Sequence, residues 1–498
     1  MKRKDRPIPG VVEMGTALPA WLYLPLQRLQ QQMQAEVYLA GGTVRDLVLG
    51  RTPHDLDLVV PDKSHSWARA LAKAVGGAFV PLGGEDAARV VFQGQAVDVS
   101  SFRDGSLTIE EDLAKRDLSI NAMAICLTPF LRHGVRRQGE QVTLLDPCGG
   151  LLDIEQQVIR CPDVQILHSD PLRMLRVYRF SAALGFRVEV QTARWVGALS
   201  EELRHCAPER ICHEFRLILE SENSAAVIGA MAEAGLLWVL FPELERGVGM
   251  QQPASHHLDV FSHNLETLRC LESLLRDPCY GYAREYKELA AYLAVDRQRT
   301  LLKWAALFHD VGKPVTRALN QEGERRITFY NHDQAGQRIF NEIALRLRLS
   351  NWERNHVGQL IGLHMRPFHL IQAAKDRELS IRACSRLIRK AGRLIPGLFL
   401  LALADTMAGK GEDRPATLEQ DLEAVVRRVL AVERDHVQPA LRVPPLIDGH
   451  DLIHSLGLQP GPVFKEILEA VEEARIEGQV QTKDQALSLA SSLVSGEQ

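Results

Sequence analysis

The stretch HDLDLVV, residues 54–60, places two aspartates one residue apart within a short apolar run. A strand that is half-buried in a sheet turns successive side chains to opposite faces. Asp55 and Asp57 are therefore predicted to share one face, while Leu56 and Leu58 point into the core. Two neighbouring carboxylates repel each other, so we expect a positive group or ion to lie between them.

The sequence YLAGGTVRDLVLG, residues 38–50, precedes this acidic strand and changes from an apolar run to a helical pattern at Gly41 and Gly42. Glycines at a strand-to-helix turn let the backbone approach a ligand, and the N–H groups at a helix start suit phosphate oxygens. Arg45 adds positive charge in the first turn. A Gly-Gly pair alone usually marks only a turn, but paired carboxylates beside it are typical of magnesium-dependent phosphoryl transfer.

A third carboxylate, Asp98, lies in the β-like run QAVDVSSF, residues 95–102. It alternates with Val97 and Val99, so its side chain is predicted to leave the core face and to lie beside Asp55 and Asp57. A solvated strand residue fits the same pattern, and the residues alone leave both interpretations open. In the first interpretation all three aspartates are catalytic, and Asp55 and Asp57 hold Mg²⁺.

The composition is that of an ordinary globular protein: 498 residues, 46% hydrophobic and 24% charged. This length suggests roughly three domains. The net charge of −4 requires any contact with nucleic acid to come from local basic faces. Eight scattered cysteines without a C-x-x-C motif favour reduced thiols and a cytoplasmic location. The early segment ALPAWLYLPL is broken by prolines, which argues against a signal peptide, and we expect no membrane span.

Short β-like runs alternate with helical patterns from residue 18 to about residue 147, which predicts an α/β or α+β domain. After residue 165 the strand signals end, and apolar residues recur at helical spacing to the end of the chain. Glycines and prolines near residues 242–255, and the polar stretch GKGEDRP at residues 409–415, indicate breaks between domains.

The combination GGTVRDLVLG and DLDLVV resembles the signature of class II tRNA nucleotidyltransferases and bacterial poly(A) polymerases, whose catalytic head is similar to that of DNA polymerase β. The segment KRDLSINAMAI, residues 115–125, resembles a second motif that holds the triphosphate and ribose, and it implies this role for Arg116, Asp117 and Asn121. The segment LLDPCGGLLDIEQQVIR, residues 144–160, matches the part of the family that closes the head.

The resemblance implies an α+β protein: a polymerase β-type head with a mixed sheet and helices, an all-α neck, an HD domain and a helical tail. The expected divisions are a disordered lead at 1–15, the head at 16–160, the neck at 161–250, the HD domain at 251–410 and the tail at 411–498.

A base-selecting motif is predicted in HSDPLRMLRVYRF, residues 168–180. Asp170, Arg173, Arg176 and Arg179 recur every three residues, so they are expected on one helix face. A carboxylate can accept from the exocyclic amine of cytosine or adenine, while a guanidinium donates to the ring. The residues alone favour an amphipathic surface helix, but the family motif E-D-x-x-R implies a protein template for CTP and ATP.

This chain carries Ser169 where the family motif has a glutamate that steadies the arginine, which leaves the nucleotide preference open. The next segment, APERICHEFRLIL at residues 207–219, resembles the neck motif of the family. That resemblance implies a structural role for Glu209 and Arg210.

A second constellation lies downstream, where histidine and aspartate recur in apolar surroundings. Its members are His263, His309, Asp310, His332, His364 and Asp405. Single histidines of this kind are usually structural, but nitrogen and oxygen donors together suit a divalent transition metal. The set resembles the HD phosphohydrolase superfamily, which implies hydrolysis of a phosphomonoester or cyclic phosphodiester. A retained scaffold without activity is the alternative.

The segment RACSRLIRKAGR, residues 382–393, carries several cations on a helical stretch. Arg382, Arg386, Arg389 and Lys390 are predicted to bind RNA phosphates, and a solvated helix face is an equal alternative. The segment LIDGHDLIHSLGLQPGPVFKEIL, residues 446–468, resembles the family tail that lies near the body of a bound tRNA.

The resemblance implies template-independent addition of C, A or both to the 3′ end of tRNA, with CTP and ATP as substrates. Poly(A) polymerase, a CC-only enzyme and an A-only enzyme share these motifs and remain alternatives. An alternative of another class is an HD phosphohydrolase in which the head only binds RNA.

Overall fold

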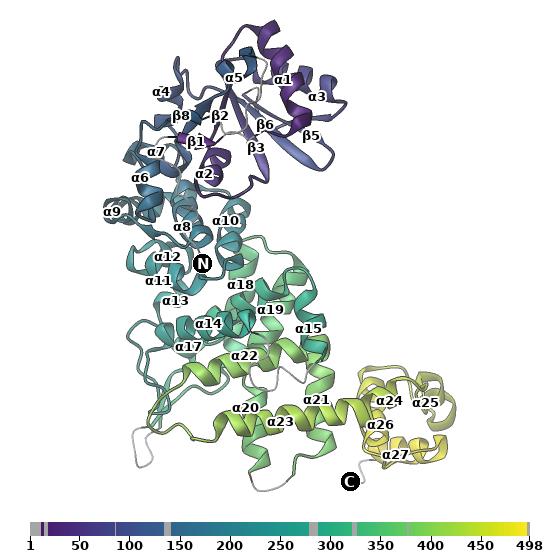
Figure 1. Ribbon diagram of the computed structural model, residues 1–498. Helices are drawn as coiled ribbons and strands as arrows, with labels where there is room; N and C mark the ends of the chain where they lie inside the picture. The colour runs from purple at the N-terminus through teal and green to yellow at the C-terminus, as the bar shows by residue number, and fades with distance from the viewer. Residues whose placement is uncertain are drawn as a thin grey trace. The chain divides into compact units, whose positions relative to one another are not determined.

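The computed structural model describes residues 11–13, 18–84, 86–133, 141–277, 287–320, 326–375 and 378–495 (Figure 1). The chain divides into two compact units. Unit 1 comprises Met1–Ser221 with Ala230–Leu240, and unit 2 comprises Glu222–Gly229 with Phe241–Gln498. The predicted α+β class is confirmed, because a mixed sheet with helices is followed by mostly helical regions.

Unit 1 begins with an eight-stranded sheet in the order β1-β8-β7-β2-β3-β6-β5-β4. All neighbouring strands are antiparallel except β3 and β6, which are parallel. The strands are β1 Val11–Glu13, β2 Tyr38–Ala40, β3 Asp55–Val60, β4 Ala78–Pro81, β5 Ala87–Phe92, β6 Gln95–Ser101, β7 Ala124–Cys126 and β8 Gln141–Leu145.

The predicted alternation in β3 is correct, because Leu56 and Leu58 are buried while Asp55 and Asp57 are only half-buried. The central helix α3 buries Trp67 and Leu71 and packs against β5 and β6. The head helices are α1 Ala20–Met33, α2 Gly42–Val48, α3 Ser64–Val75, α4 Ile109–Ala114, α5 Thr128–His133 and α6 Gly150–Glu155, with a 3-10 turn at Ser119–Asn121. The contacts of α3 with β5 and β6 hold the acidic strand β3 in the sheet, because β6 is its neighbour.

The expectation of a disordered lead at 1–15 is wrong for Val11–Glu13, which form β1 and pair with β8. The other residues of that lead lie outside the described residues. A three-residue strand is too short for a period-two pattern, so its pairing partner, and not its own sequence, determines it.

The neck follows in unit 1. Its elements are β9 Val158–Ile159, α7 Val164–Ser169, α8 Arg173–Leu184, β10 Arg187–Val188, α9 Val190–Leu199, a 3-10 helix at Ser200–His205, α10 Pro208–Glu220 and α12 Leu236–Leu240. Helix α11 Ser224–Glu233 is divided between the units, with its residues up to Gly229 in unit 2. The prediction that strands end before residue 165 is wrong for β10, which pairs in parallel with β9. Two residues are too few for alternation to be visible in the sequence.

The described residues of unit 2 are helical apart from two antiparallel strands, β11 Ala318–Asn320 and β12 Arg326–Thr328. Its HD region contains α13 Pro242–Glu245, α14 Val260–Arg276, α15 Lys287–Ala294, α16 Gln298–Phe308, α17 Lys313–Thr316, α18 His332–Arg346, α19 Asn351–Leu363, α20 Arg366–Ala374, α21 Ile381–Ala391 and α22 Ile395–Ala408. The remaining helices are α23 Leu418–Val432, a π-helical turn at Glu433–Val437, α24 Gln438–Leu441, α25 Gly449–Leu456, α26 Pro462–Ile476 and α27 Lys483–Ser495.

The apolar helix α22 lies at the centre of unit 2, where it packs against α14, α16 and α23. Twelve of its residues are buried, which explains why its sequence is hydrophobic on every side. Within the described residues, no helix has both the length and the apolar character needed to cross a bilayer. The most apolar segment of the chain is therefore a core helix.

Candidate functional site

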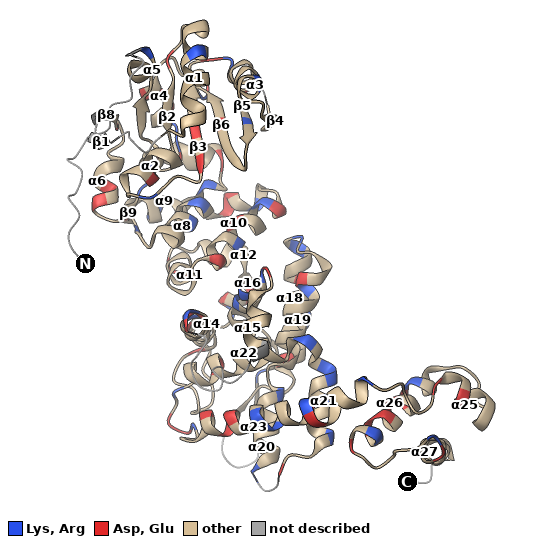
Figure 2. Ribbon diagram, turned by 45° about the vertical axis from the view of Figure 1, so that its right-hand side comes forward, with Lys and Arg blue, Asp and Glu red and all other residues tan. Residues whose placement is uncertain are grey.

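Three aspartates gather on one face of the head sheet, as the sequence predicts. In the parallel pair β3 and β6, Asp57 lies directly opposite Asp98. Asp55 precedes Asp57 by two residues and shares its face. Figure 2 shows the resulting acidic end of β3, and also the basic residues of α8 in the same unit.

The positive group beside these carboxylates is Arg89 of β5, which the sequence reasoning did not single out. Arg89 lies opposite Asp98 in the antiparallel pair β5 and β6. Its Nε and Nη2 donate to the two carboxylate oxygens of Asp98 at 2.7 and 2.8 Å. Its Nη2 also lies 3.9 Å from Oδ2 of Asp55. The alternation in AARVVF marks Arg89 as outward-facing, but only the strand order brings it to Asp98.

The start of α2 holds Asp57 in place. The Thr43 hydroxyl donates to the Asp55 carbonyl and accepts from the Asp57 N–H at 2.7 Å. The Thr43 N–H also donates to the Asp57 carboxylate, and the Gly41 N–H donates to the Met123 carbonyl. Burial raises the pKa of Asp57, although the N–H groups of Thr43 and Gly42 and the Arg116 guanidinium oppose the shift. The prediction of free N–H groups for phosphate is therefore wrong for Gly41 and Thr43.

Gly41 is required by its surroundings. Its φ is +68°, and a Cβ at this position would lie 2.8 Å from Nη1 of Arg116 and 3.1 Å from Oδ2 of Asp57. A Cβ on Gly42 would lie 3.3 Å from the same Asp57 oxygen. These glycines therefore leave bare backbone where a cation and a carboxylate approach closely.

A cavity of 360 Å³ lies above this floor. The predicted residues that line it are Gly41, Gly42, Arg45, Asp57, Asp98, Arg116, Asp117, Asn121 and Arg176. Arg45 donates to the Asn121 side chain at 2.9 Å, and Asn121 donates to Asp117. The guanidinium groups of Arg45 and Arg176 also lie 5.1 and 5.6 Å from the Phe180 ring. Several cations thus surround a space next to paired carboxylates, which suits a polyanionic phosphate chain.

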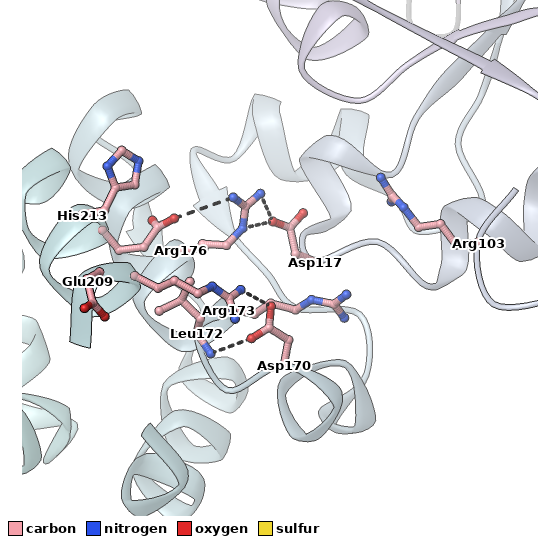
Figure 3. Close-up of a pocket in the computed structure, with 10 residues that line it drawn as sticks. Arg103, Asp117, Asp170, Leu172, Arg173, Arg176, Glu209 and His213 are labelled. Atoms are coloured by element: carbon pink, nitrogen blue, oxygen red, sulfur yellow. Dashed lines mark hydrogen bonds and ion pairs between the residues drawn. The ribbon is translucent and has the colours of Figure 1, made fainter. Parts of the chain in front are cut away.

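A second cavity, of 530 Å³, is lined by Asp170 and Arg173 (Figure 3). It shares Arg103, Asp117 and Arg176 with the first cavity. Arg176 donates to Asp117 at 2.8 Å, so the ion pair stands at the border of the two spaces. Both cavities lie within unit 1, and they form one candidate site because they share three lining residues.

The predicted helix face is correct only in part. Helix α8 begins at Arg173, and Asp170 lies in the preceding turn, where it caps the backbone of Leu172. Arg173 and Arg176 face the cavity (Figure 3). Arg179 instead pairs with buried Glu214 at 3.3 Å and lies 4.4 Å from the Phe180 ring.

The second constellation assembles in unit 2 from five helical segments. His263 belongs to α14, His309 and Asp310 follow α16, His332 starts α18, His364 follows α19 and Asp405 belongs to α22. His263 Nε2 lies 2.9 Å from the Asp405 carboxylate, and His332 Nε2 lies 3.3 Å from the Asp310 carboxylate. His256 joins His263 and Asp405 within ligand distance, and the sequence reasoning missed it. Its sequence SHH, outside any helix, gave no periodic signal.

The imidazoles are oriented for a shared ligand. His309, His332 and His364 each place Nδ1 2.7 to 2.9 Å from a backbone carbonyl three residues earlier. This contact assigns the proton to Nδ1 and leaves the Nε2 lone pair for the centre. The buried Nε2 of His309 has no hydrogen-bond partner within the described part of the chain. The donor set therefore fits a divalent metal ion, whose identity the geometry leaves open.

Lys313 adds a cation to this centre, because its Nζ lies 2.5 Å from Asp310. Burial alone would raise the pKa of Asp310, but His309 and Lys313 outweigh it and hold the pKa well below the usual value. Asp310 is thus an anion in the folded protein. Asp310 and Lys313 line a cavity of 760 Å³ that also contains Arg366 and Arg414.

Family models match four successive parts of the chain. They describe a poly A polymerase head domain at residues 37–160, the RNA and SrmB-binding site of polymerase A at 185–247, an HD domain at 260–407 and tRNA nucleotidyltransferase domain 2 at 435–490.

One curated relative is the A-adding tRNA nucleotidyltransferase of Deinococcus radiodurans, which is 35% identical over 454 residues, covering 90% of this chain and 93% of the relative. This chain belongs to the class II tRNA nucleotidyltransferase family. The CC-adding tRNA nucleotidyltransferase of Thermus thermophilus is 31% identical over 463 residues, 91% of this chain and 92% of the relative. The family predicted from the sequence motifs is confirmed.

A solved structure of a CCA-adding enzyme with ATP has the same fold, with a TM-score of 0.65 at 21% identity, covering 99% of each chain. For a tRNA nucleotidyltransferase, the departure at Ser169 has a structural answer. The Ser169 hydroxyl accepts from Nη1 of Arg173 at 3.0 Å, and the Ile166 carbonyl accepts from the same nitrogen at 3.1 Å. The shorter serine thus steadies the arginine in place of the glutamate of the family motif.

Arg210 of this tRNA nucleotidyltransferase does more than its predicted structural role indicates. Its Nη2 donates to Oδ2 of Asp170 at 2.9 Å, so it orients the carboxylate that is predicted to read the base. Sequence reasoning did not connect the two residues, because they are 40 positions apart and belong to different elements.

The arginines proposed for RNA contact converge on one carboxylate. Arg382, Arg386 and Arg389 of α21 all pair with Glu473 of α26, and the first two do so at 3.3 and 3.2 Å. Lys390 lies exposed on the same helix. The arginines therefore also fasten the tail helix, and their contact with RNA stays a prediction.

Proposed function

We propose that this chain adds C or A nucleotides to the 3′ end of tRNA, using CTP and ATP as substrates. The observation that carries the proposal is the pair of adjoining cavities in unit 1. One is lined by Asp57 and Asp98 and the other by Asp170 and Arg173, and Arg103, Asp117 and Arg176 line both. A nucleotide can therefore place its phosphates beside the carboxylates and its base beside the reading pair.

Arg45 and Arg116 bind the triphosphate over the bare floor of Gly41 and Gly42. Asp117 lies at the border of the two cavities and Asn121 lines the first, and together they bind the ribose. The 3′ hydroxyl of the tRNA attacks the α-phosphate, and pyrophosphate leaves.

Asp55 and Asp57 would hold Mg²⁺, and Asp98 completes the acidic face. The fit rests on three hard oxygen donors on one face, of which half-buried Asp57 lies opposite Asp98. Mg²⁺ supplies, when bound, neutralisation of phosphate charge and a more acidic attacking hydroxyl. The protein holds the aspartates of β3 and β6 at a fixed distance from the arginines that position the phosphates.

The base is chosen by complementary hydrogen bonds. The Asp170 carboxylate accepts from the exocyclic amine that cytosine and adenine share, and the Arg173 guanidinium donates to the ring. Uracil and guanine lack that amine on the matching edge, so they leave the carboxylate unpaired. Ser169 and Arg210 hold the two reading groups in register.

The experiment offers tRNA transcripts lacking one, two or three 3′ nucleotides, with each nucleoside triphosphate supplied separately. We expect extension by C, A or both and no extension by U or G. The pattern identifies a CC-adding, an A-adding or a complete CCA-adding enzyme. Long oligoadenylate products on a generic primer would identify a poly(A) polymerase instead, and absence of any extension would refute the proposal.

We infer a second activity, metal-dependent hydrolysis of a phosphomonoester or cyclic phosphodiester, from the centre in unit 2. The inward Nε2 atoms of buried histidines support it, with Lys313 and Arg366 in the same cavity for phosphate. Such an activity would trim a damaged RNA end before addition. The test measures metal content and hydrolysis of both substrate types in the wild-type chain and in Asp310→Ala. Metal-free protein without hydrolysis would reduce this centre to a structural scaffold.

A further inference from the structure

Arg89 is the closest cation to the acidic face, and no role in the reaction has been assigned to it above. Its guanidinium lies in a fork against Asp98, with donor distances of 2.7 and 2.8 Å. Both oxygens of that carboxylate are therefore used by one side chain. The same guanidinium reaches 3.9 Å from Asp55, across the position where the acidic strand ends.

The negative charges on this face outnumber the positive charge of Arg89. Asp55, Asp57 and Asp98 contribute three negative charges to one face of the sheet, and Arg89 supplies one positive charge against them. The hydrogen bonds that Arg89 donates to Asp98 raise the pKa of Arg89, so the guanidinium stays charged. A divalent cation that binds Asp98 must compete with this guanidinium for the same oxygens and is repelled by it at Asp55.

We propose that Arg89 is an internal counter-ion of the acidic face, which occupies Asp98 before the nucleotide arrives and releases it when a divalent cation binds. The inference rests on the proposed function, because it takes the acidic face to be the cation site. The cation that accompanies the nucleotide replaces Arg89 at Asp98. The nucleotide-free head consequently binds free cations weakly.

The test is a titration of the full chain with Mn²⁺ alone, in which free Mn²⁺ is counted by electron paramagnetic resonance. All proteins carry Asp310→Ala, so that any binding in the HD region is the same in each. We expect Arg89→Gln to lower the dissociation constant about fivefold, since one competing ion pair is removed. In an Asp98→Asn background the same change has little effect, because the competition acts through Asp98.

Two further variants separate this inference from the proposed function. Arg69→Gln also removes one positive charge from the head, but Arg69 lies 4.5 Å from the Phe79 ring, so we expect an unchanged dissociation constant. Asp57→Asn must weaken Mn²⁺ binding if the acidic face is the cation site, and unchanged binding would overturn the site itself. If Asp57→Asn weakens binding while Arg89→Gln leaves it unchanged or weaker, only the counter-ion role is refuted. Arg89→Lys, which keeps the charge without the fork, should lie between wild type and Arg89→Gln.

Discussion

The head of unit 1 and the HD region of unit 2 both bring carboxylates together, but the residues that meet are separated by different lengths of sequence. In the head, Asp57 and Asp98 are direct neighbours on paired strands, and an arginine already balances them. In the HD region, His263 and Asp405 meet from 142 positions apart, and imidazoles replace the arginine. The acidic face of the head is thus half-exposed, which favours the exchanging cation that we propose, whereas the HD centre is buried and suits a resident ion.

The sharpest test of this comparison removes one carboxylate from each site. Asp57→Asn should reduce nucleotide addition by about 10³-fold, because the cation loses its most buried ligand. Hydrolysis by the HD region should be unchanged. Asp310→Asn should give the reverse pattern. Initial rates of both reactions on the same preparations provide the measurement, and a parallel loss of both activities would show that the sites are not independent.

Acid should destabilise the HD region through its buried imidazoles. Burial lowers the pKa of His356 from 6.5 to about 4, so the folded state binds a proton less readily than the unfolded state. Stability is therefore lost as the pH falls from 6.5 towards 4, and the loss is complete below the folded pKa. We expect about 2 kcal/mol of this loss between pH 7 and pH 5.

Denaturant unfolding of wild type and His356→Gln at pH 7 and pH 5 measures this contribution. The Tyr292 hydroxyl lies 3.0 Å from the imidazole, and a glutamine oxygen can accept from it. Other buried histidines titrate in both proteins, so the difference isolates His356. An equal loss of stability in the two proteins would contradict the assignment.

Base selection in the head should depend on a single hydroxyl. Ser169→Ala removes one of two acceptors from Arg173, and we expect discrimination between CTP and ATP to change about fivefold. Ratios of kcat/KM for the two nucleotides provide the measurement. Ser200→Ala is the matched control, since its hydroxyl makes a similar backbone bond to the Gly197 carbonyl without an arginine. The same change of ratio in both variants would remove Ser169 from the reading pair.

The smallest expected effect concerns the tail. Glu473→Gln removes the carboxylate that gathers three arginines of α21, so these arginines become available to phosphate. We expect tRNA to bind about twofold more tightly, with a steeper dependence on salt. Filter binding at two salt concentrations measures both quantities. Weaker binding at low salt would instead mean that the tail must stay fastened for tRNA to dock.

Much of the head could be predicted from the sequence because its information is local. Period-two alternation was enough to place Asp55 and Asp57 on one face, and the glycines before them marked the turn. Sequence reasoning also expected Asp98 there, although the residues alone left its environment open. The α+β class and the family are confirmed, whereas the roles of the individual site residues stay predictions that the experiments above test.

The missing parts depend on tertiary pairing. Arg89 becomes meaningful only when β5 is known to lie beside β6, and Arg210 only when α10 approaches Asp170. The sequence does not distinguish Glu473 from other helical glutamates, and only the fold shows that three arginines pair with it. The short strands β1 and β10, and the antiparallel pair β11–β12, carry too few residues for a periodic signal.

The bare backbone at Gly41 limits how an enzyme of this design can diverge. Any side chain there would displace Arg116 or Asp57, so the floor beneath the phosphates tolerates almost no sequence drift. Position 169 tolerates substitution better, because Ser169 makes contact through one hydroxyl only. Substitutions that alter substrate preference, in evolution or in a laboratory selection, should therefore accumulate around Ser169, while Gly41 stays invariant.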